Sequence, residues 1–504
     1  MTTLIDPLRR AVRTAPDAIA ARCGDIEITY EQTWDRARRL VGALRELGVR
    51  DGERVAVVGR NCHRYLELYQ AVAGAGMVLV PLNQRHTAAE LAYALEDSGA
   101  RVLFVASGID YPDGIVDHVI DLDEGYEALV AAAPTAEFPD VLPPDTMAGL
   151  FYTGGTTGAS KGVILSHRNL VANAFHFQAQ FAFRPDTSWL VAAPLFHAAG
   201  SIAVLATVWH GGCQVMLPVF EPAAALDLIE AHRVTATLVV PTMLAALAEE
   251  QLARPRDVAS LRLLSHGGSP VATETLRRAH QAFGGAELMH LYGTTETAPI
   301  VTIMANEDTL LDLPQARSCG QPAIGVEVRV LDEETGRTAA AGAVGEVVIR
   351  GENVMAGYWN KPEATAEAMV DGWYRTSDLG YMDERSFLYL VDRAKDMIVS
   401  GGENVYSTEV EEVLYGHPAV LEAAVFGIPD ARWGEAVHAV VVPRGEVAEA
   451  DLVSHCRGAI ADYKIPKRIE LRTNPLPKSG AGKVLKRELR APYWTGRESV
   501  VGGA

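Results

Sequence analysis

Apolar positions in the first hundred residues recur with helical and strand spacing, and polar residues mark where each helix begins. Thr29 and Gln32 have the spacing of a capping box, in which each side chain bonds the backbone N–H of the other at a helix start. The apolar face of that predicted helix carries Trp34, Ala37, Val41, Leu44 and Leu47. Thr87 and Glu90 repeat the pattern and predict a second helix that runs toward Ser98.

Short apolar runs predict strands between these helices. Residues 53–58, 78–82 and 101–106 are each rich in branched apolar side chains. Strands that alternate with helices indicate a largely parallel sheet, so we expect an α/β fold. From residue 320 to residue 350 the pattern changes to short strands separated by turn residues, as in VEVRV and GEVVIR, which predicts a small β-rich subdomain.

The length of the chain indicates more than one domain. A chain of 504 residues is too long for a single compact core. A new run of elements follows Asp392 and is long enough for a separate small domain. The expected architecture is therefore multi-domain α/β, with a large N-terminal domain and a small, mobile α+β C-terminal lid domain.

The chain is acidic, with 64 Asp and Glu against 45 Lys and Arg and a formal net charge of −19. Such a surface repels nucleic acid and anionic lipid, although a local loop can still bind a nucleotide phosphate. The longest apolar stretch, residues 191–209, contains Pro194, His197 and Gly200, so we expect buried core and no transmembrane segment. Five scattered cysteines argue against a zinc site or disulfides, and no apolar run of signal-peptide length opens the chain, so a cytoplasmic location is expected.

Residues 152–162 read YTGGTTGASKG, a loop rich in glycine and threonine. Glycines let backbone N–H groups approach an anion closely, threonine hydroxyls donate further hydrogen bonds, and Lys161 adds positive charge. The loop lacks the Walker spacing, because Lys161 is followed by Gly162 rather than by serine or threonine. A flexible surface turn is the alternative, but the length and order of the loop favour a triphosphate site. The residues predicted to bind ATP here are Thr153, Gly154, Gly155, Thr156, Thr157, Gly158 and Lys161.

This loop resembles the signature of the adenylate-forming superfamily, which includes acyl-CoA synthetases, adenylation domains of nonribosomal peptide synthetases and firefly luciferase. The usual pattern is YTSGTTGxPKG; the chain departs from it at Gly154, which lacks the serine hydroxyl, and at Ser160, where the loss of proline should loosen the loop. Further segments follow in family order: PLFHAAG at 194–200, HGGSP at 266–270, YGTTE at 292–296, YRTSDLG at 374–380, DRAKDMIVSGGENVY at 392–406 and PKSGAGK at 477–483. The resemblance covers nearly the whole chain and implies an ATP-dependent, AMP-forming carboxylic acid–coenzyme A ligase.

The resemblance also implies which residues bind the nucleotide. The segment that would contact adenine contains Gly267, Gly268 and Ser269. Asp378 would accept hydrogen bonds from the ribose hydroxyls, and Arg393 would contact ribose or phosphate. The alternatives are a turn residue for Asp378 and a surface ion pair for Arg393. The segment 292–296 adds Tyr292, Gly293, Thr294 and Thr295 to the predicted nucleotide site.

The implied first reaction joins a carboxylate to the α-phosphorus of ATP, so two anions must be brought together without any need for a general base. A mobile ammonium group suits this task, and Lys483 is the implied candidate, with an ordinary solvated lysine as the alternative. Glu296, together with Thr157, is expected to hold Mg²⁺ against the phosphates, and Thr295 to donate to the α-phosphate. The alternative is that Glu296 has only a structural role, as an acidic side chain whose charge is stabilised by the dipole at a helix N-terminus.

The implied second reaction needs the thiol of coenzyme A at the same carbon after Lys483 has left, which a rotating lid accomplishes. The resemblance puts the hinge at Lys395 and the pantetheine tunnel at Ser400, Gly401 and Gly402, for which an ordinary loop is the alternative. The predicted division is residues 1–392 for the N-terminal domain, 393–396 for the hinge and 397–504 for the lid.

The residues expected to line the acyl pocket are His197, Ala198, Ser201 and Gly293. His197 stands where amino-acid-adenylating relatives carry an aspartate, and its alternative is a satisfied core histidine. Gly293 stands where acetate-specific relatives carry a tryptophan, and the uncharged Ala246 and Leu291 stand where malonate-specific relatives carry arginines. These differences predict an apolar acid longer than acetate, and a medium- or long-chain fatty acid is the main expectation.

Several alternatives stay open. The acid could instead be aromatic, of the benzoate or cinnamate type, or the acyl group could pass to a carrier protein. A nucleotide-binding pseudoenzyme is disfavoured, because Lys483, Glu296, Asp378 and Arg393 are all present. The expected partners are the carboxylic acid, ATP and coenzyme A, with Mg²⁺ as cofactor, and the sequence is compatible with a monomer or a homodimer.

Overall fold

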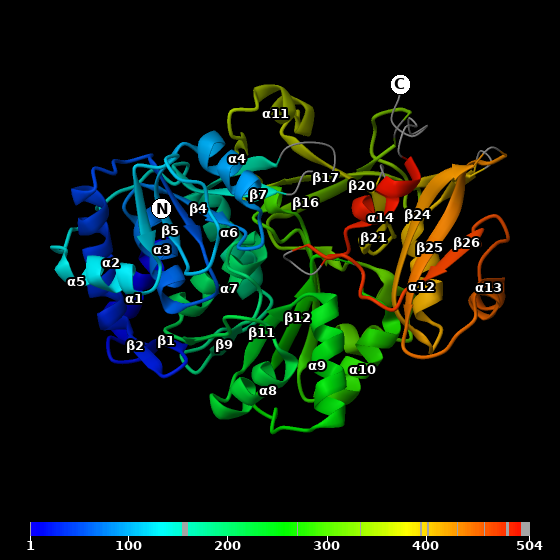
Figure 1. Cartoon of the computed structure of the whole chain (residues 1–504), viewed down its shortest axis with the longest axis horizontal. Helices are drawn as coiled ribbons and strands as arrows, with labels where there is room; N and C mark the ends of the chain where they lie inside the picture. Colours follow the sequence, from blue (N-terminus) through cyan, green and yellow to red (C-terminus); the bar gives the residue numbers. More distant parts are fainter. Residues whose placement is uncertain are drawn as a thin grey trace.

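The computed structural model describes residues 2–153, 160–269, 271–332, 334–393, 396–400, 403–430, 432–457, 459–479 and 483–494, apart from the side chains of residues 308 and 393. Four β-sheets organise these residues, three in the N-terminal part and one in the C-terminal part. In Figure 1 the N-terminal elements lie on the left and in the centre, and the C-terminal elements, orange and red, lie on the right.

The largest sheet has nine strands in the order β15-β14-β13-β12-β11-β9-β10-β1-β2. Its six central strands, from β13 to β1, are parallel to their neighbours, and the outer strands are antiparallel. The strands are β1 (Ile19–Cys23), β2 (Ile26–Thr29), β9 (Ser188–Val191), β10 (Cys213–Met216), β11 (Ala236–Val239), β12 (Leu263–Gly267), β13 (Glu287–Tyr292), β14 (Thr302–Met304) and β15 (Gln321–Pro322).

The second sheet has seven strands in the order β18-β8-β7-β4-β3-β5-β6, and it is parallel from β7 to β6. Strand β8 turns back antiparallel to β7, and β18 continues beside it. The strands are β3 (Arg54–Val58), β4 (Val78–Leu82), β5 (Ala100–Val105), β6 (His118–Asp121), β7 (Met147–Thr153), β8 (Lys161–Ser166) and β18 (Gly357–Tyr358). The two large sheets confirm the predicted α/β fold with largely parallel strands.

Helices cover both large sheets and fill the space between them. α3 (His63–Gly74) is buried along almost its whole length, because it packs on β4 and β7 of one sheet and on β1 of the other. α7 (Ala198–Trp209) is also almost entirely buried, against β9 and β10. The other helices of the large sheets are α1 (Asp6–Thr14), α2 (Tyr30–Glu46), α4 (Ala88–Ser98), α5 (Glu124–Ala132), α6 (His167–Gln178), α8 (Pro222–Ala231), α9 (Pro241–Ala253) and α10 (Thr273–Phe283).

A third, antiparallel sheet confirms the predicted β-rich subdomain. It contains β16 (Val326–Leu331), β17 (Gly345–Gly351), β19 (Met369–Val370), β20 (Trp373–Met382) and β21 (Leu388–Arg393). The short helix α11 (Pro362–Ala368) connects β18 to β19. Short 3₁₀ helices lie at Thr295–Thr297, Glu307–Leu310 and Pro314–Arg317.

The C-terminal part is a fourth sheet covered by helices, with its own apolar core. Its strands are β22 (Ile398–Ser400), β23 (Glu403–Val405), β24 (Val420–Asp430), β25 (Gly434–Pro443) and β26 (Arg468–Leu471). Its helices are α12 (Ser407–Tyr415), α13 (Glu449–Arg457) and α14 (Lys486–Trp494). We call this part the lid, and it sits beside β20 and β21 in Figure 1.

The residues that predicted individual elements behave as expected at most positions. Both capping boxes form, so α2 begins after Thr29 and α4 after Thr87. The strand predicted at 78–82 is β4, and those predicted at 53–58 and 101–106 are β3 and β5 with ends shifted by one residue. The apolar stretch 191–209 becomes the end of β9, a loop and the buried α7. None of the helices in the described ranges combines the length and apolar character that crossing a bilayer requires.

Candidate active site

The segments that carry the predicted nucleotide residues begin where strands of the two large sheets end. β7 ends at Thr153, β12 ends at Gly267, and β13 ends at Tyr292. Loops at the carboxyl ends of parallel strands form the usual ligand-binding edge of an open α/β sheet. The three segments therefore follow strand ends of the kind that hold ligands in this class of fold, which is compatible with the predicted nucleotide site.

The neck of the glycine-rich loop is a hairpin between β7 and β8. Thr153 pairs with Lys161 across it, and the Ser160 hydroxyl donates to the Thr153 carbonyl. The Tyr93 hydroxyl of α4 also donates to the Ser160 carbonyl, at 3.0 Å. The serine that replaces the usual proline thus closes the neck with a hydrogen bond. The predicted phosphate ligands Gly154, Gly155, Thr156, Thr157 and Gly158 lie outside the described residues.

The segment predicted to contact adenine depends on close backbone packing at the end of β12. A Cβ atom at Gly267 would lie 2.1 Å from the carbonyl oxygen of Leu291 on the adjacent β13, so no other residue fits without a backbone shift. Gly268 has φ = 85°, a left-handed conformation that glycine adopts at least cost. Ser269 follows this turn, and Pro270 lies outside the described residues. The two glycines hold the turn close to β13.

Tyr292 and Asp378 come together from different sheets. The Tyr292 hydroxyl donates to Asp378 Oδ2 at 2.7 Å, and both side chains are buried. Burial and then the charge of Asp378 raise the pKa of Tyr292 well above its usual value, so the phenol remains a donor. Asp378 lies in β20, paired with Arg393 of β21. Two of the predicted ribose ligands are therefore neighbours across one strand pair, although the Arg393 side chain lies outside the described residues.

Glu296 lies three residues beyond Gly293, in the 3₁₀ helix that follows β13. The Tyr358 hydroxyl donates to Glu296 Oε1 at 2.9 Å, and the backbone N–H of Met355 donates to the Glu296 carbonyl at 2.8 Å. Among the described residues, Glu296 Oε2 has no hydrogen-bond partner. Glu296 is half-buried, one of its carboxylate oxygens accepts a hydrogen bond, and the other remains available to a ligand. Such a carboxylate fits Mg²⁺, which prefers oxygen ligands. Thr294 and Thr295 are half-buried beside it.

Gly293 has a packing role that the sequence did not predict. A Cβ atom there would lie 1.6 Å from the carbonyl oxygen of Pro299, so the backbone of the following segment occupies the side-chain position. A tryptophan at this position would require that segment to move. The structure explains the glycine by this contact, and the room for an acid longer than acetate that was inferred from Gly293 stays a prediction.

His197 is the N-cap residue that directly precedes α7, at the centre of the segment expected to line the acyl pocket. Its ring packs on Phe196 with ring centroids 5.3 Å apart. Burial, and next the nearby His86, lower the pKa of His197 to about 4, so the imidazole is neutral at physiological pH. Ala198 and Ser201 are buried in the first turns of α7, where the Ser201 hydroxyl donates to the Ala198 carbonyl at 2.7 Å. The Ser201 hydroxyl proton is therefore already donated to a hydrogen bond within its own helix.

Two residues that the sequence did not single out fix this segment in place. Asn61 donates its amide N–H to the carbonyl oxygens of Val191 and Ala193, both at 3.1 Å, and accepts from the Leu195 N–H at 2.9 Å. Tyr69 of α3 donates its hydroxyl to the Leu195 carbonyl. These contacts span more than a hundred residues of sequence, so no local pattern could have revealed them.

Lys483 is exposed and directly follows residues 480–482, which lie outside the described residues. Its backbone N–H donates to Ser479 Oγ at 3.2 Å, and the Ser479 N–H donates to its carbonyl at 2.7 Å. The two neighbouring lysines are engaged elsewhere: Lys478 contacts Glu422, and Lys486 bonds Glu411 at 2.7 Å. Gly480 and Gly482 lie outside the described residues. Lys478 and Lys486 therefore have structural contacts of their own within the lid.

The lid contacts the N-terminal part at several points. Asp392, at the end of β21, accepts a hydrogen bond at 2.6 Å from the Ser407 N–H, the first residue of α12. This carboxylate also satisfies one of the N–H groups that a helix start leaves without a partner. Ser400 is buried in β22. The predicted hinge residue Lys395 and the predicted tunnel residues Gly401 and Gly402 lie outside the described residues.

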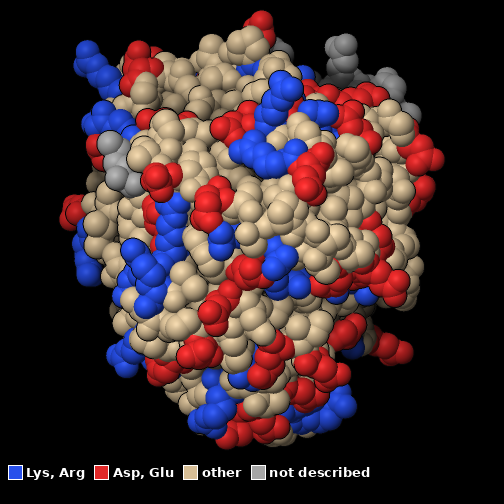
Figure 2. Space-filling model, turned by 90° about the vertical axis from the view of Figure 1, so that its left-hand side faces the viewer, with Lys and Arg blue, Asp and Glu red and all other residues tan. Residues whose placement is uncertain are grey.

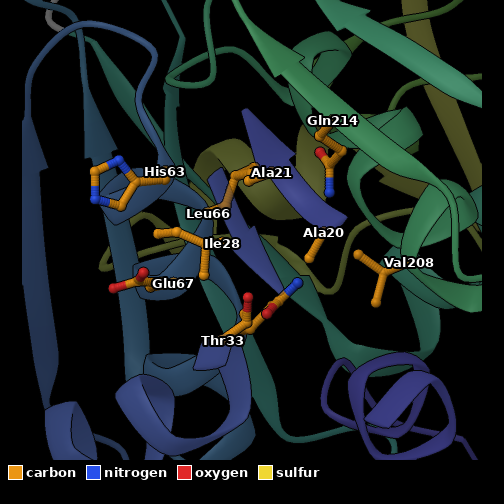
Figure 3. A pocket seen from close by; sticks show the side chains of 10 residues that line it. Ala20, Ala21, Ile28, Thr33, His63, Leu66, Glu67, Val208 and Gln214 are labelled. Carbon is orange, nitrogen blue, oxygen red and sulfur yellow. The ribbon is translucent and has the colours of Figure 1, made fainter. Parts of the chain in front are cut away.

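A small cavity lies away from all of these motifs, between β1, α3 and β10 (Figure 3). Its volume is about 10 Å³, which is room for roughly one water molecule. Buried Gln70 and Gln214 side chains line it, and their Oε1 atoms have no hydrogen-bond partner among the described residues. The cavity is too small for any substrate and is not the active site.

The surface agrees with small-molecule substrates. In Figure 2 acidic and basic side chains are interspersed over the face shown, with no continuous basic area. Together with the net charge of −19, the face shown offers little attraction to nucleic acid.

Comparison with known proteins identifies the family. Residues 8–359 match the AMP-binding enzyme family, and residues 409–483 match the AMP-binding enzyme C-terminal domain. A feruloyl-CoA synthase from Amycolatopsis sp. is 41% identical over 97% of this chain and 98% of its own. A medium/long-chain-fatty-acid–CoA ligase from Mycobacterium tuberculosis is 34% identical over 95% of this chain and 88% of its own.

Solved structures agree with these sequence matches. The o-succinylbenzoate CoA synthetase from Bacillus subtilis, in complex with its acyl-adenylate intermediate, superposes with a TM-score of 0.88 at 32% identity, over 97% of this chain and 98% of its own. The same enzyme in complex with ATP and a magnesium ion superposes with a TM-score of 0.85, over 96% and 98% of the two chains. The resemblance drawn from the motifs is confirmed over nearly the whole chain. The chain therefore belongs to the AMP-binding, adenylate-forming enzyme family and is an AMP-forming acid–thiol ligase.

Proposed function

We propose that this enzyme converts an aromatic acid of the hydroxycinnamate type into its coenzyme A thioester. The observation that carries the proposal is the 41% identity to a feruloyl-CoA synthase over 97% of the chain, against 34% to the fatty acid ligase. The superposed synthetase from Bacillus subtilis also holds an aromatic acyl-adenylate. This proposal favours the aromatic alternative over the aliphatic acid that was the main expectation from sequence.

The residues expected to line the acyl pocket are uncharged, which favours an apolar acid. His197 is neutral and packs on Phe196, so neither residue offers a charge to a second carboxylate or to an amine. Ala246 and Leu291 supply no charge either. A flat ring with an uncharged tail satisfies these conditions, and the neutral imidazole of His197 can exchange a hydrogen bond with a ring hydroxyl.

In the proposed first step the substrate carboxylate attacks the α-phosphorus of ATP, and pyrophosphate leaves. The Lys483 ammonium bridges the carboxylate and the α-phosphate, which offsets the repulsion between the two anions. The glycine-rich loop, with Lys161, holds the β- and γ-phosphates, and Asp378 accepts hydrogen bonds from the ribose hydroxyls. The segment Gly267–Ser269 and the Tyr292 side chain contact the adenine. Thr295 donates to the α-phosphate.

Mg²⁺ belongs to this proposal as the cofactor that neutralises phosphate charge when it is bound. Glu296 would hold it, with Thr157 from the glycine-rich loop. The single hydrogen-bonded oxygen of Glu296 leaves its second oxygen for a cation, which fits this assignment.

In the proposed second step the thiolate of coenzyme A attacks the acyl carbonyl carbon, and AMP leaves. Rotation of the lid about Lys395 withdraws Lys483 and brings the segment Ser400–Gly402 to the site, where the two glycines leave room for pantetheine. Arg393, which directly follows Asp392, stays with the ribose or phosphate of AMP.

A substrate panel tests the choice of acid. We expect kcat/KM for thioester formation with ferulate or 4-coumarate to exceed that with octanoate by at least about tenfold, because an aliphatic chain would lose the contacts to a planar ring worth ~1–3 kcal/mol. Benzoate has the aromatic ring without the propenoic side chain, so its kcat/KM shows how much of the preference comes from the ring alone. A higher kcat/KM for octanoate or palmitate than for every aromatic acid would refute the proposal in favour of a fatty acid ligase.

A carrier protein as acceptor is tested in the same assay. Adenylate formed from ferulate should be consumed on addition of coenzyme A, with AMP and thioester appearing in equal amounts. Adenylate that accumulates while coenzyme A stays unused would point to another acceptor.

A further inference from the structure

Tyr358 stands at a junction between the glycine-rich loop and the segment that carries Glu296. It lies in β18, which pairs with β8, the strand that leaves the loop, so that Tyr358 faces Val163 in register. The backbone N–H of Trp359 donates to the Gly162 carbonyl at 2.8 Å and anchors this pairing close to the loop. The Tyr358 N–H itself donates to Thr365 Oγ1 of α11 at 2.9 Å. The backbone of Tyr358 is therefore fixed on both sides.

The side chain of Tyr358 contacts two groups that the proposed mechanism uses. Its hydroxyl donates to Glu296 Oε1 at 2.9 Å, across 62 residues of sequence. Its ring lies under the Lys161 ammonium, with Nζ 4.9 Å from the ring centroid, within the range of a cation–π interaction. One side chain thus contacts both the carboxylate expected to hold the metal and the cation expected to hold phosphate.

The direction of this hydrogen bond suits the arrangement, because the Tyr358 hydroxyl donates and the Glu296 carboxylate oxygen accepts. A donor to Oε1 fixes the orientation of the carboxylate and leaves Oε2 for a ligand.

We infer that Tyr358 is a positioning residue, whose hydroxyl orients Glu296 for the metal and whose ring orients Lys161 for the phosphates. It touches no reacting atom and acts through these two side chains. The inference rests on the proposed function, because it takes Glu296 as the metal ligand. Partners that orient a metal-binding side chain commonly affect metal affinity 10–100-fold.

The test measures metal binding rather than turnover. Mn²⁺, a stand-in for Mg²⁺ that electron paramagnetic resonance detects, is titrated into the enzyme with a saturating non-hydrolysable ATP analogue. Tyr358→Phe removes the hydroxyl and keeps the ring, so we expect Mn²⁺ affinity to fall by about tenfold. Affinity for the analogue without metal should stay unchanged in Tyr358→Phe and fall in Tyr358→Leu, which also removes the ring over Lys161.

Tyr381→Phe is the matched control, because Tyr381 lies in β20 stacked on Tyr389 and away from Glu296. Its Mn²⁺ affinity should equal that of the wild type. Glu296→Gln should weaken Mn²⁺ binding at least as much as Tyr358→Phe, and adding Tyr358→Phe to Glu296→Gln should change little further, because both act through one carboxylate.

The outcomes separate the inference from the function on which it rests. Wild-type Mn²⁺ affinity in Tyr358→Phe, with weakened binding in Glu296→Gln, would overturn the inference and leave the metal role of Glu296 standing. Wild-type affinity in Glu296→Gln would remove that metal role and the inference with it. Equal losses of metal-free analogue binding in Tyr358→Phe and Tyr358→Leu would indicate general damage to the site and would also overturn the inference.

Discussion

The buried amide of Asn61 makes most of the side-chain hydrogen bonds that hold the segment between β9 and α7, in which His197 lies. Its side chain is almost fully buried and hydrogen-bonds three backbone groups of residues 191–195. Ala193 and Leu195 lie outside any strand or helix, so the Asn61 amide supplies their backbone groups with hydrogen bonds that no ladder provides there. The position of His197 therefore depends on a residue far away in the sequence.

Asn61→Ala should lower the free energy of unfolding by about 2–3 kcal/mol, because buried carbonyl and N–H groups would lose their partners. Equilibrium unfolding in urea at pH 7 measures the change. Asn404→Ala, at an exposed position of β23, is the control and should stay within ~0.5 kcal/mol of the wild type. Equal stability of the two variants would show that water or a local shift replaces the Asn61 contacts.

At the residue scale, the sequence predicts the functional residues that stand in motifs. It does not reveal residues whose partners are far away along the chain. Glu296 and Asp378 stand in ordered motifs, from which the sequence predicts a Mg²⁺ ligand and a ribose ligand. Tyr358 and Asn61 were not predicted, because their partners lie 62 residues or more away and neither residue belongs to a periodic pattern. Ser160 was expected only to loosen the loop, whereas its hydroxyl closes the neck.

Helix starts are the elements that the sequence predicts best. α4 begins with a complete capping box: the Thr87 N–H donates to Glu90 Oε2 at 2.8 Å, and the Glu90 N–H donates to Thr87 Oγ1 at 3.3 Å. The backbone N–H of Thr87 is the largest cause that lowers the pKa of Glu90. Glu90 thus contributes to stability as a carboxylate at the helix N-terminus.

Glu90→Ala should cost about 1 kcal/mol at pH 7, because it removes the reciprocal bond and a favourable charge at the helix start. Since the folded-state pKa of Glu90 lies below its ordinary 4.5, this contribution is complete above pH 4.5 and is lost as the pH falls through the folded-state value. The difference between wild type and variant, measured by urea unfolding at pH 7 and at lower pH, should therefore shrink on acidification.

Glu96→Ala, in the last turn of the same helix, serves as the comparison. Its carboxylate is close to the negative end of the helix dipole, so its removal should be neutral or slightly stabilising at pH 7. A cost for Glu96→Ala as large as that for Glu90→Ala would mean that general surface charge, rather than the capping box, is responsible.

Strands divide into those that a periodic pattern can reveal and those that it cannot. β4 matched its predicted bounds because five successive buried apolar residues form it. β15, β18 and β19 have two residues each, too short for any period, and exist only because neighbouring strands supply hydrogen bonds. β18, which carries Tyr358, is one of these. The contact between Tyr358 and Glu296 therefore depends on a strand that forms only through its pairing with β8.

On the scale of the whole molecule, the orientation of the lid brings the start of α14 close to α4. Arg487, near the start of α14, is close enough to α4 that its charge helps the Thr87 N–H to lower the pKa of Glu90. α4 in turn bonds the neck of the glycine-rich loop through Tyr93. Lys483 lies only a few residues before Arg487, so this orientation suits the adenylation step of the proposed mechanism.

Contacts on the far side of the lid help to hold this orientation. Thr273, the first residue of α10, donates its hydroxyl to Glu412 of α12 at 3.0 Å. Arg444, just after β25, pairs with Glu249 of α9. Both partners of that ion pair are partly exposed, so it is worth no more than about 1 kcal/mol. A contact of that strength can bias the lid without locking it.

Arg444→Gln should therefore slow adenylation by up to about fivefold, the factor that ~1 kcal/mol represents, and leave transfer from preformed adenylate to coenzyme A undiminished, because only one lid orientation loses a contact. Single-turnover pyrophosphate release and thioester formation measure the two steps separately. Arg457→Gln, on α13 of the lid, is the control, since the described residues give its side chain no ion pair with the N-terminal part. Equal slowing of both steps by Arg444→Gln would show that the pair stabilises the fold rather than one orientation, whereas unchanged adenylation would show that Asp392 and Thr273 hold the lid without it.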